Sequence, residues 1–196
     1  MVVRRSFALL ISLALMTQAA SCSKRENSLP PPRAVQGLVL TLQTDKQSYK
    51  AGDAITVTCV LTNVGSADIA LLQWGWERET DWMRAMDSRG NYAESVLIGI
   101  LDAVPRRKIK PEDFTVLKAG GSYRRVYVGR ITAPKRDFFI AFDYSALLLK
   151  RFGDCWLWAE YSVSLEWTNK LAATFPPTKV FDGCVTSEAV RISVEK

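Results

Sequence analysis

Residues 38–63 read LVLTLQTDKQSYKAGDAITVTCVLTN, and this stretch decides the fold class. Leu38, Leu40 and Leu42 recur at every second position in its first half. From Ile55 to Leu61 apolar residues again occupy every second position, mostly with threonine between them. A period of two places alternate side chains on opposite faces of a β-strand, whereas a helix repeats every 3.6 residues. The stretch therefore predicts two half-buried strands, joined by a turn at 49–53 whose glycine accepts a positive φ.

The rest of the sequence repeats this pattern in short runs separated by turn residues. Further strands are predicted at 69–76, 123–131, 138–142, 155–167 and 190–194, with turns at 63–68, 87–91 and 119–122. A single helical turn is predicted at 111–114, and a short helix at 146–152, which Ser145 caps and Gly153 ends. Seven to nine strands with one or two short helical turns are typical of an all-β fold, an Ig-like antiparallel β-sandwich.

The alternating runs also predict the core of this sandwich. Two sets of apolar residues share the inward phase of their strands and should pack against each other across the sandwich. The first set is Ile55, Val57 and Leu61, and the second is Leu157, Ala159 and Val163.

The composition restricts both the size and the chemistry of the protein. A chain of 196 residues that is 48% hydrophobic can bury one substantial core, so one domain is expected. Arg4 and Arg5 lie in an N-terminal segment that is expected to be removed as an export signal. Without them the chain has 24 basic and 20 acidic residues, and this mild excess of positive charge does not indicate nucleic-acid binding. Histidine is absent, which excludes HExxH zinc sites and nucleophiles that depend on a histidine base. No metal or cofactor is expected.

The N-terminal segment has the pattern of an export signal. Two arginines precede a short apolar run, and small residues then lead to Cys22. The run is about 10 residues long, too short to cross a hydrocarbon core of ~30 Å. The end of the segment resembles the lipobox of bacterial lipoproteins, with Ala19 in place of the usual leucine. This resemblance implies cleavage before Cys22 and lipidation of its thiol; ordinary cleavage, giving a secreted or periplasmic protein, is the alternative.

The sequence after the signal divides into a tether and a domain. Residues 22–33 are polar and then proline-rich, which predicts an extended segment without a core of its own. The expected organisation is a signal peptide at 1–21, the tether at 22–33 and a single β-sandwich domain at 34–196. The predicted location is the cell envelope, on a membrane that the lipid anchor enters.

Three cysteines remain in the domain, and export favours disulfide formation among them. A Cys155–Cys184 bridge closes the shorter segment of sequence and is the favoured pairing. A Cys59–Cys155 bridge is the alternative, because both residues share the inward phase of their strands. Either pairing leaves one thiol free, and three free thiols are the remaining alternative.

Two sets of residues are candidates for a binding surface, namely strand tryptophans and a basic cluster. They are Trp74, Trp76, Trp156, Trp158, Arg106 and Arg107. Aromatic rings on an outer face can stack on sugars or contact a protein, unless the excursion at 77–118 folds back and covers them. The arginines can meet an anionic partner, or they form a solvated loop that Glu112 and Asp113 partly neutralise.

Carboxylates near turns offer a third kind of site. Asp143, Asp154 and Asp182 can be combined into an acid pair or a calcium site, but isolated aspartates at turns more commonly accept backbone hydrogen bonds. No spacing points to paired carboxylates. A carboxylate-dependent hydrolase is therefore the weakest of the alternatives.

Short motifs resemble two kinds of known domain. The opening of several Ig-like families, including BsuPI-type proteinase-inhibitor and macroglobulin-type domains, is similar to Thr44-Asp45-Lys46, Tyr49, Gly52-Asp53 and Leu61-Thr62-Asn63. The non-catalytic sandwich region of deuterolysin-like zinc peptidases is similar to the order Arg106-Arg107, Pro111, Glu112-Asp113-Phe114, Leu117, Ala119-Gly120-Gly121-Ser122 and the strand at 153–161. The sequence has no HExxH motif, so the resemblance carries over no catalytic residue.

These observations predict a non-catalytic, lipid-anchored binding module of the cell envelope. The resemblances imply an alternative, an inhibitor or regulator of an extracytoplasmic peptidase. Such inhibitors usually act through a protruding loop, so an ordered and exposed segment within 77–113 favours this second function. The partners expected are a membrane, through the anchor, and an envelope protein or peptidase.

Overall fold

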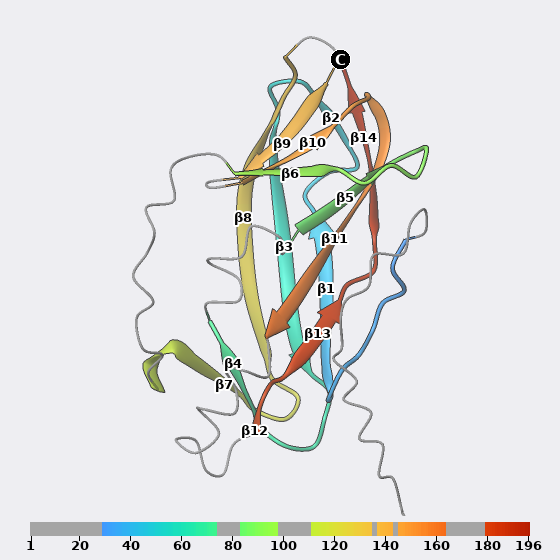
Figure 1. Ribbon diagram of the computed structural model, residues 1–196. Coiled ribbons are helices and arrows are strands. Elements are labelled where there is room, and N and C mark those ends of the chain that lie inside the picture. The colour runs from blue at the N-terminus through green and yellow to red at the C-terminus, as the bar shows by residue number, and fades with distance from the viewer. Residues whose placement is uncertain (1–28, 74–82, 98–110, 135–136, 143–144, 164–178) are drawn as a thin grey trace, which may run out of the picture.

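The computed structural model describes residues 29–73, 83–97, 111–134, 137–142, 145–163 and 179–196. Within these ranges the protein is all-β, with fourteen strands in three sheets and one 3-10 turn (Figure 1). The predicted all-β class is confirmed. The predicted count of seven to nine strands was too low, because strands of two to five residues complete the sheets beside the long alternating ones.

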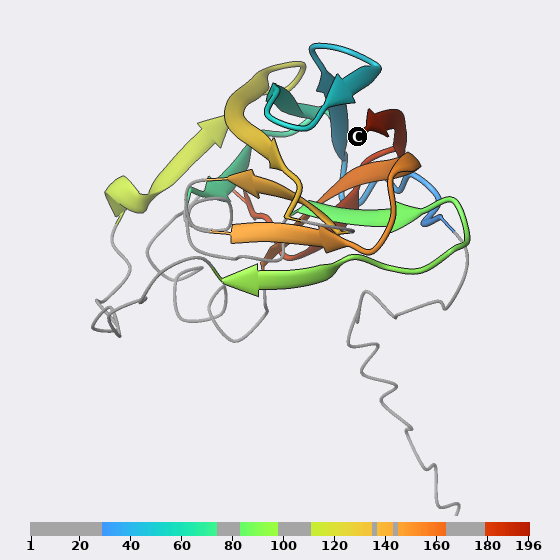
Figure 2. The ribbon, with the colours of Figure 1, turned by 90° about the horizontal axis from the view of Figure 1, so that it is seen from above.

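The largest sheet has six strands in the order β1-β3-β8-β9-β10-β6. Their bounds are β1 Leu38–Thr44, β3 Ala54–Asn63, β8 Ser122–Thr132, β9 Phe138–Phe142, β10 Ser145–Leu149 and β6 Glu94–Leu97. All neighbours in this sheet are antiparallel. Whereas β3 and β8 pair along nine positions, β8 and β9 pair only at Arg130–Thr132. Seen from above, β9, β10 and β6 lie side by side at one end of the molecule (Figure 2).

Two smaller sheets complete the fold. The five-stranded sheet is formed by β13 Gly183–Thr186, β11 Gly153–Val163, β14 Val190–Glu195, β2 Ser48–Lys50 and β5 Met83–Asp87. Here β11 pairs with β14 and β5 along its first half and with β13 along its second half. The three-stranded sheet is formed by β12 Lys179–Val180, β4 Ile69–Leu72 and β7 Phe114–Leu117. Two pairs are parallel, β2 with β14 and β4 with β12.

The core lies where the predicted inward phases meet. Both predicted sets, from β3 and β11, are buried and belong to a single hydrophobic cluster. Leu157 is fully buried, as predicted, whereas Thr58 on the opposite phase of β3 is half-buried. The alternation of the sequence therefore assigned the inner faces of both strands correctly.

The helix predicted at 146–152 is not formed. Residues 145–149 are instead β10, which pairs with β9 on one side and with β6 on the other. The run Ala-Leu-Leu-Leu is compatible with either state by local preference, and hydrogen bonding to two neighbouring strands decides for the strand. The helical turn predicted at 111–114 is confirmed as the 3-10 turn η1 Pro111–Asp113. The hairpin turn predicted at 87–91 is also confirmed, between β5 and β6.

Asn63, at the end of β3, connects two segments through its side chain, which is completely buried. Its Nδ2 group donates to the carbonyl oxygens of Ala67, Leu117 and Lys118 at 2.8, 3.1 and 3.2 Å. Its Oδ1 atom accepts the backbone N–H of Gly65 at 3.0 Å. Because the partners belong to the turn after β3 and to the β7–β8 connection, one side chain holds two segments that lie far apart in sequence.

Candidate functional site

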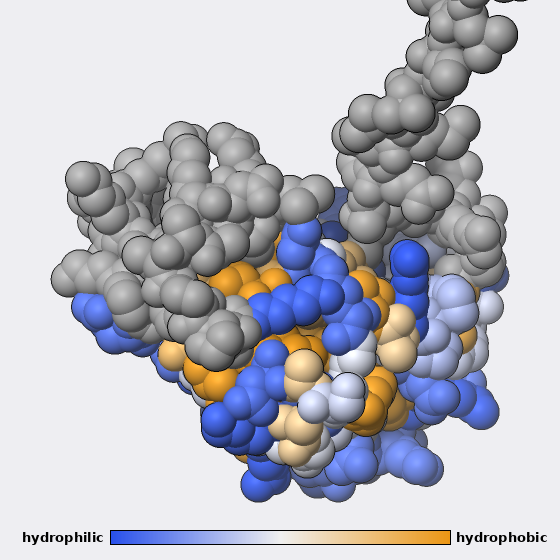
Figure 3. Space-filling view, turned by 90° about the horizontal axis from the view of Figure 1, so that it is seen from below, coloured by the Kyte–Doolittle hydropathy of each residue, from blue (hydrophilic) through white to orange (hydrophobic). Residues whose placement is uncertain are grey.

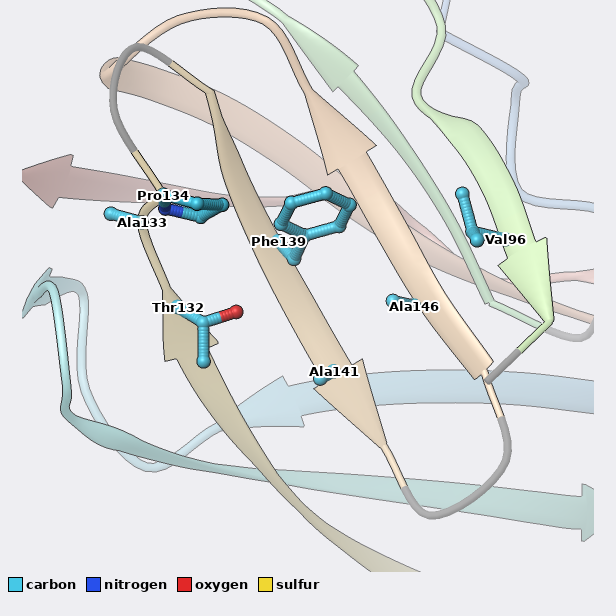
Figure 4. A pocket seen from close by; sticks show the side chains of 7 residues that line it. All are labelled: Val96, Thr132, Ala133, Pro134, Phe139, Ala141 and Ala146. Carbon is cyan, nitrogen blue, oxygen red and sulfur yellow. The ribbon is translucent and has the colours of Figure 1, made fainter. Parts of the chain in front are cut away.

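A groove of about 530 Å³ lies on the outer face of the six-stranded sheet (Figure 4). It is lined by Val96, Thr132, Ala133, Pro134, Phe139, Ala141 and Ala146. Phe138, Ile140 and Phe142 of β9 point into the core, and the alternate residues Phe139 and Ala141 therefore face outward. We call this feature the outer-face groove.

The groove is hollow because small side chains are paired across neighbouring strands. Ala146 of β10 lies opposite Val96 on one side and opposite Ala141 on the other. One step along the strands, Phe139 lies opposite Thr132 and Leu148. Two methyl groups thus form the floor between larger side chains, that of Ala141 partly exposed and that of Ala146 only 1% exposed. Val96 and Thr132 lie on opposite sides of it, and Phe139 lies next to it (Figure 4).

Gly129 of β8 brings the floor to this position. A Cβ atom built on Gly129 would lie 2.6 Å from the carbonyl oxygen of Ala141 and 2.8 Å from the ring of Phe142. Real Cβ atoms essentially never make such contacts, so only glycine lets β9 approach β8 this closely. Gly129, which permits the close approach of the strands, therefore lies directly beside Ala141, which forms part of the floor.

Among the described residues, charged side chains stand around the groove but do not line it. Arg130 lies opposite Ala141, on the outer phase of β8, and it is exposed. Lys150 Nζ lies 2.9 Å from Glu94 Oε1, and this hydrogen bond and charge raise the pKa of Lys150. Arg130 forms no ion pair with any other described residue.

The predicted tryptophan surface is wrong for Trp158, which is only 1% exposed. Its ring meets the edge of Tyr92 at 5.7 Å between centroids, and its Nε1 group donates to Glu160 Oε1 at 3.3 Å. Tyr92 follows β5 in the hairpin, so the alternative, in which the excursion covers the strand tryptophans, holds for this residue. Trp156 is half-buried. Trp74, Trp76, Arg106 and Arg107 lie outside the described residues.

Neither predicted disulfide is formed, because Cys59 and Cys155 are both free thiols. Cys184 lies opposite Ser162, seven residues along β11 from Cys155. At ~3.3 Å per residue this offset is roughly 23 Å, far beyond the ~4.4–6.8 Å between Cα atoms that a disulfide spans. Cys59 and Cys155 do share the core, where burial raises the pKa of each thiol to about 12. Cys22, the predicted lipidation site, lies outside the described residues.

The three candidate aspartates do not form a site in the described part of the chain. Asp154 pairs with Arg191 on the neighbouring strand, and burial raises the pKa of the Asp182 carboxyl. Asp143 lies outside the described residues. No group of three or more potential metal ligands occurs among the residues described, and none of their helical segments is long and apolar enough to cross a bilayer.

Sequence reasoning missed Asp87 at the end of β5, which accepts more side-chain hydrogen bonds than any other carboxylate in the described part of the chain. It is 4% exposed, and it accepts the backbone N–H groups of Arg89 and Asn91 at 2.9 Å each. The Nδ2 group of Asn91 also donates to both carboxylate oxygens. Burial alone would raise the pKa of Asp87, but these bonds outweigh it and lower the pKa. The carboxylate holds the turn rigid, and Ser88 and Arg89 remain exposed at its tip.

The part of the lower face that is coloured in Figure 3 shows no comparable apolar hollow. On the described part of that face, apolar residues lie in small areas separated by hydrophilic ones (Figure 3). The outer-face groove is therefore the strongest candidate site in the described residues. A scan against protein-family models and a search of curated proteins found no match for the chain.

Proposed function

We propose that this protein is an exported, lipid-anchored binding module that acts without catalysis and holds an apolar ligand in the outer-face groove. The groove carries the proposal. Of the seven described residues that line it, six are apolar, and the seventh, Thr132, contributes a single hydroxyl. Its volume lies within the ~300–1,000 Å³ usual for small-molecule sites. The lining residues that the structure describes supply contact area and no acid, base or thiol, which suits binding.

The scaffold is, in this proposal, an elaborated Ig-like β-sandwich. Its support is that the inward phases of β3 and β11, which belong to different sheets, are buried in one hydrophobic cluster. Relative to a seven-stranded sandwich, the large sheet is extended by β9, β10 and β6. The groove lies on this extension, so the added strands would provide the binding surface and the sandwich would provide the rigid support.

Filling the groove tests the proposed function. Ala141→Leu places a larger side chain on the floor, and Val64→Leu, on an exposed turn, is the matched control. Protein purified from its own envelope would be examined by native mass spectrometry, which detects retained small molecules. We expect a bound apolar compound on the wild type and on Val64→Leu, but not on Ala141→Leu. If all three proteins retain the same compound, or if the folded wild type retains none, the groove is not the binding site.

Anchoring is tested separately at Cys22. The motif before this residue and the tether after it support lipidation. Cys22→Ser should move the protein from the membrane fraction to the soluble extracytoplasmic fraction. Equal membrane association of the variant and the wild type would refute the anchor and leave the groove untouched.

One observation favours the second candidate, an inhibitor or regulator of an extracytoplasmic peptidase. The turn at 87–91 is ordered by Asp87 and presents Arg89 to solvent, as expected for a loop that docks into another protein. Arg89→Glu reverses the charge at the tip and leaves the backbone bonds to Asp87 in place. Inhibition of envelope peptidases by the wild type, lost in Arg89→Glu but kept in Ala141→Leu, would favour this function over ligand binding.

A further inference from the structure

Arg130 stands at one end of the groove floor. Strand register places Val96, Ala146, Ala141 and Arg130 in one row across β6, β10, β9 and β8. With ~4.8 Å between neighbouring strands, the row spans roughly 14 Å from Val96 to Arg130. The floor is therefore a short apolar path that begins at an aliphatic side chain and ends at a cation.

The charges around this path are arranged asymmetrically. The cation on the β10 side, Lys150, is compensated by Glu94 at 2.9 Å. On the β8 side, the structure gives Arg130 no acidic partner among the described residues. Within the described residues, an apolar ligand in the groove would thus meet the positive charge of Arg130 at one of its ends.

We propose that the groove binds a fatty acid, with the acyl chain over Ala141 and Ala146 and the carboxylate on the guanidinium of Arg130. This inference rests on the proposed function, and it names the class of ligand. A guanidinium presents two N–H groups in the plane that a carboxylate requires, so it selects an acid over an alcohol or an amine of the same length. The apolar lining provides most of the affinity, whereas Arg130 sets the orientation and the selectivity.

Isothermal titration with three probes of equal chain length tests this inference. The probes are dodecanoate, dodecanol and dodecylamine, each kept below its aggregation concentration. We expect the wild type to bind dodecanoate at least tenfold more tightly than dodecanol, and dodecylamine the least. Arg130→Gln should weaken dodecanoate binding about tenfold and leave dodecanol unchanged, since the variant loses only a charge-assisted hydrogen bond. Arg124→Gln, on the same face of β8 but away from the groove, is the control and should change neither affinity.

The outcomes separate this inference from the function on which it rests. If dodecanoate and dodecanol bind equally, and Ala141→Leu weakens both, the groove is a binding site but the carboxylate assignment is wrong. If Arg130→Gln and Arg124→Gln weaken dodecanoate equally, the effect is general surface charge and the assignment is also overturned. If no probe binds the folded wild type, a fatty acid is excluded, while the retained compound in the mass spectrometric experiment still decides the proposed function.

Discussion

Replacement of Asn63 gives the sharpest test of how the turns of this fold are held. Its buried amide donates to three carbonyl oxygens and accepts one backbone N–H. Asn63→Ala removes these bonds and leaves buried backbone groups without this partner. At ~0.5–1.5 kcal/mol net per bond, with two amide hydrogens shared among three acceptors, the loss is about 2–4 kcal/mol. That is a large share of the ~5–15 kcal/mol that stabilises an ordinary domain.

Asn63→Asp should destabilise more than Asn63→Ala at pH 7. The introduced carboxylate has the same shape but no hydrogen to donate, and its charge would face the three carbonyl oxygens. Burial and these dipoles raise the pKa of the introduced carboxyl in the folded state above its unfolded value of ~3.9. Its destabilising effect is therefore smallest below about pH 4, where the carboxyl is protonated in both states, and it grows as the pH rises toward the folded-state pKa.

Urea unfolding followed by tryptophan fluorescence, at pH 4 and pH 7, measures both effects. Thr62→Ala is the matched control, since this neighbour on β3 bonds only to exposed Ser122 and should cost less than about 1 kcal/mol. The reasoning is refuted if Asn63→Ala and Thr62→Ala unfold at the same urea concentration. It is equally refuted if the deficit of Asn63→Asp relative to Asn63→Ala is the same at the two pH values.

Three further results are expected. Leu157→Ala should cost about 2–5 kcal/mol because Leu157 is fully buried, whereas Thr58→Ala should cost little; equal effects in thermal melts would contradict the assigned inner face. Gly129→Ala should cost roughly 1–3 kcal/mol by forcing β9 away from β8, while Val128→Ala, 62% exposed, should shift the melt only slightly; similar melts would show that the strands separate freely. Iodoacetamide with peptide mapping should label Cys59 and Cys155 only after unfolding, because both thiols are buried with a pKa of about 12, and labelling of the native protein would disprove their burial.

The part of the fold that sequence alone could predict is the part that local alternation controls. Leu157 and Ile55 were placed on inner faces correctly because a period of two leaves only one choice once one face is buried. The turn at 87–91 was equally visible, since Asp, Gly and Asn favour turns for local reasons. Residues 145–149 were assigned wrongly because four consecutive apolar residues carry no period, and the choice depends on partners distant in sequence.

The candidate site depended on such distant partners throughout. Ala141 and Ala146 were visible as small residues in apolar runs, but nothing local shows that they face each other. The same limit explains why the predicted disulfides were wrong, because an inward phase does not specify the position of a residue along its partner strand. It also explains Trp158, a buried residue whose ring contacts Tyr92 of the β5–β6 hairpin, a partner distant in sequence.

The parallel pairing of β2 with β14 has a consequence for the order in which the molecule can assemble. Ser48 lies beside Ser193, and β14 is placed between β2 and β11, so the five-stranded sheet has no continuous hydrogen bonding until residues 190–195 are in position. A chain delivered N-terminus first presents β1 and β3 early, yet β2 must wait for most of the sequence to follow. Contacts this distant in sequence are slow to form, and the edges of β2 and β11 stay open meanwhile. The topology therefore requires that the open edges of β2 and β11 be kept from pairing with other chains until β14 is in place.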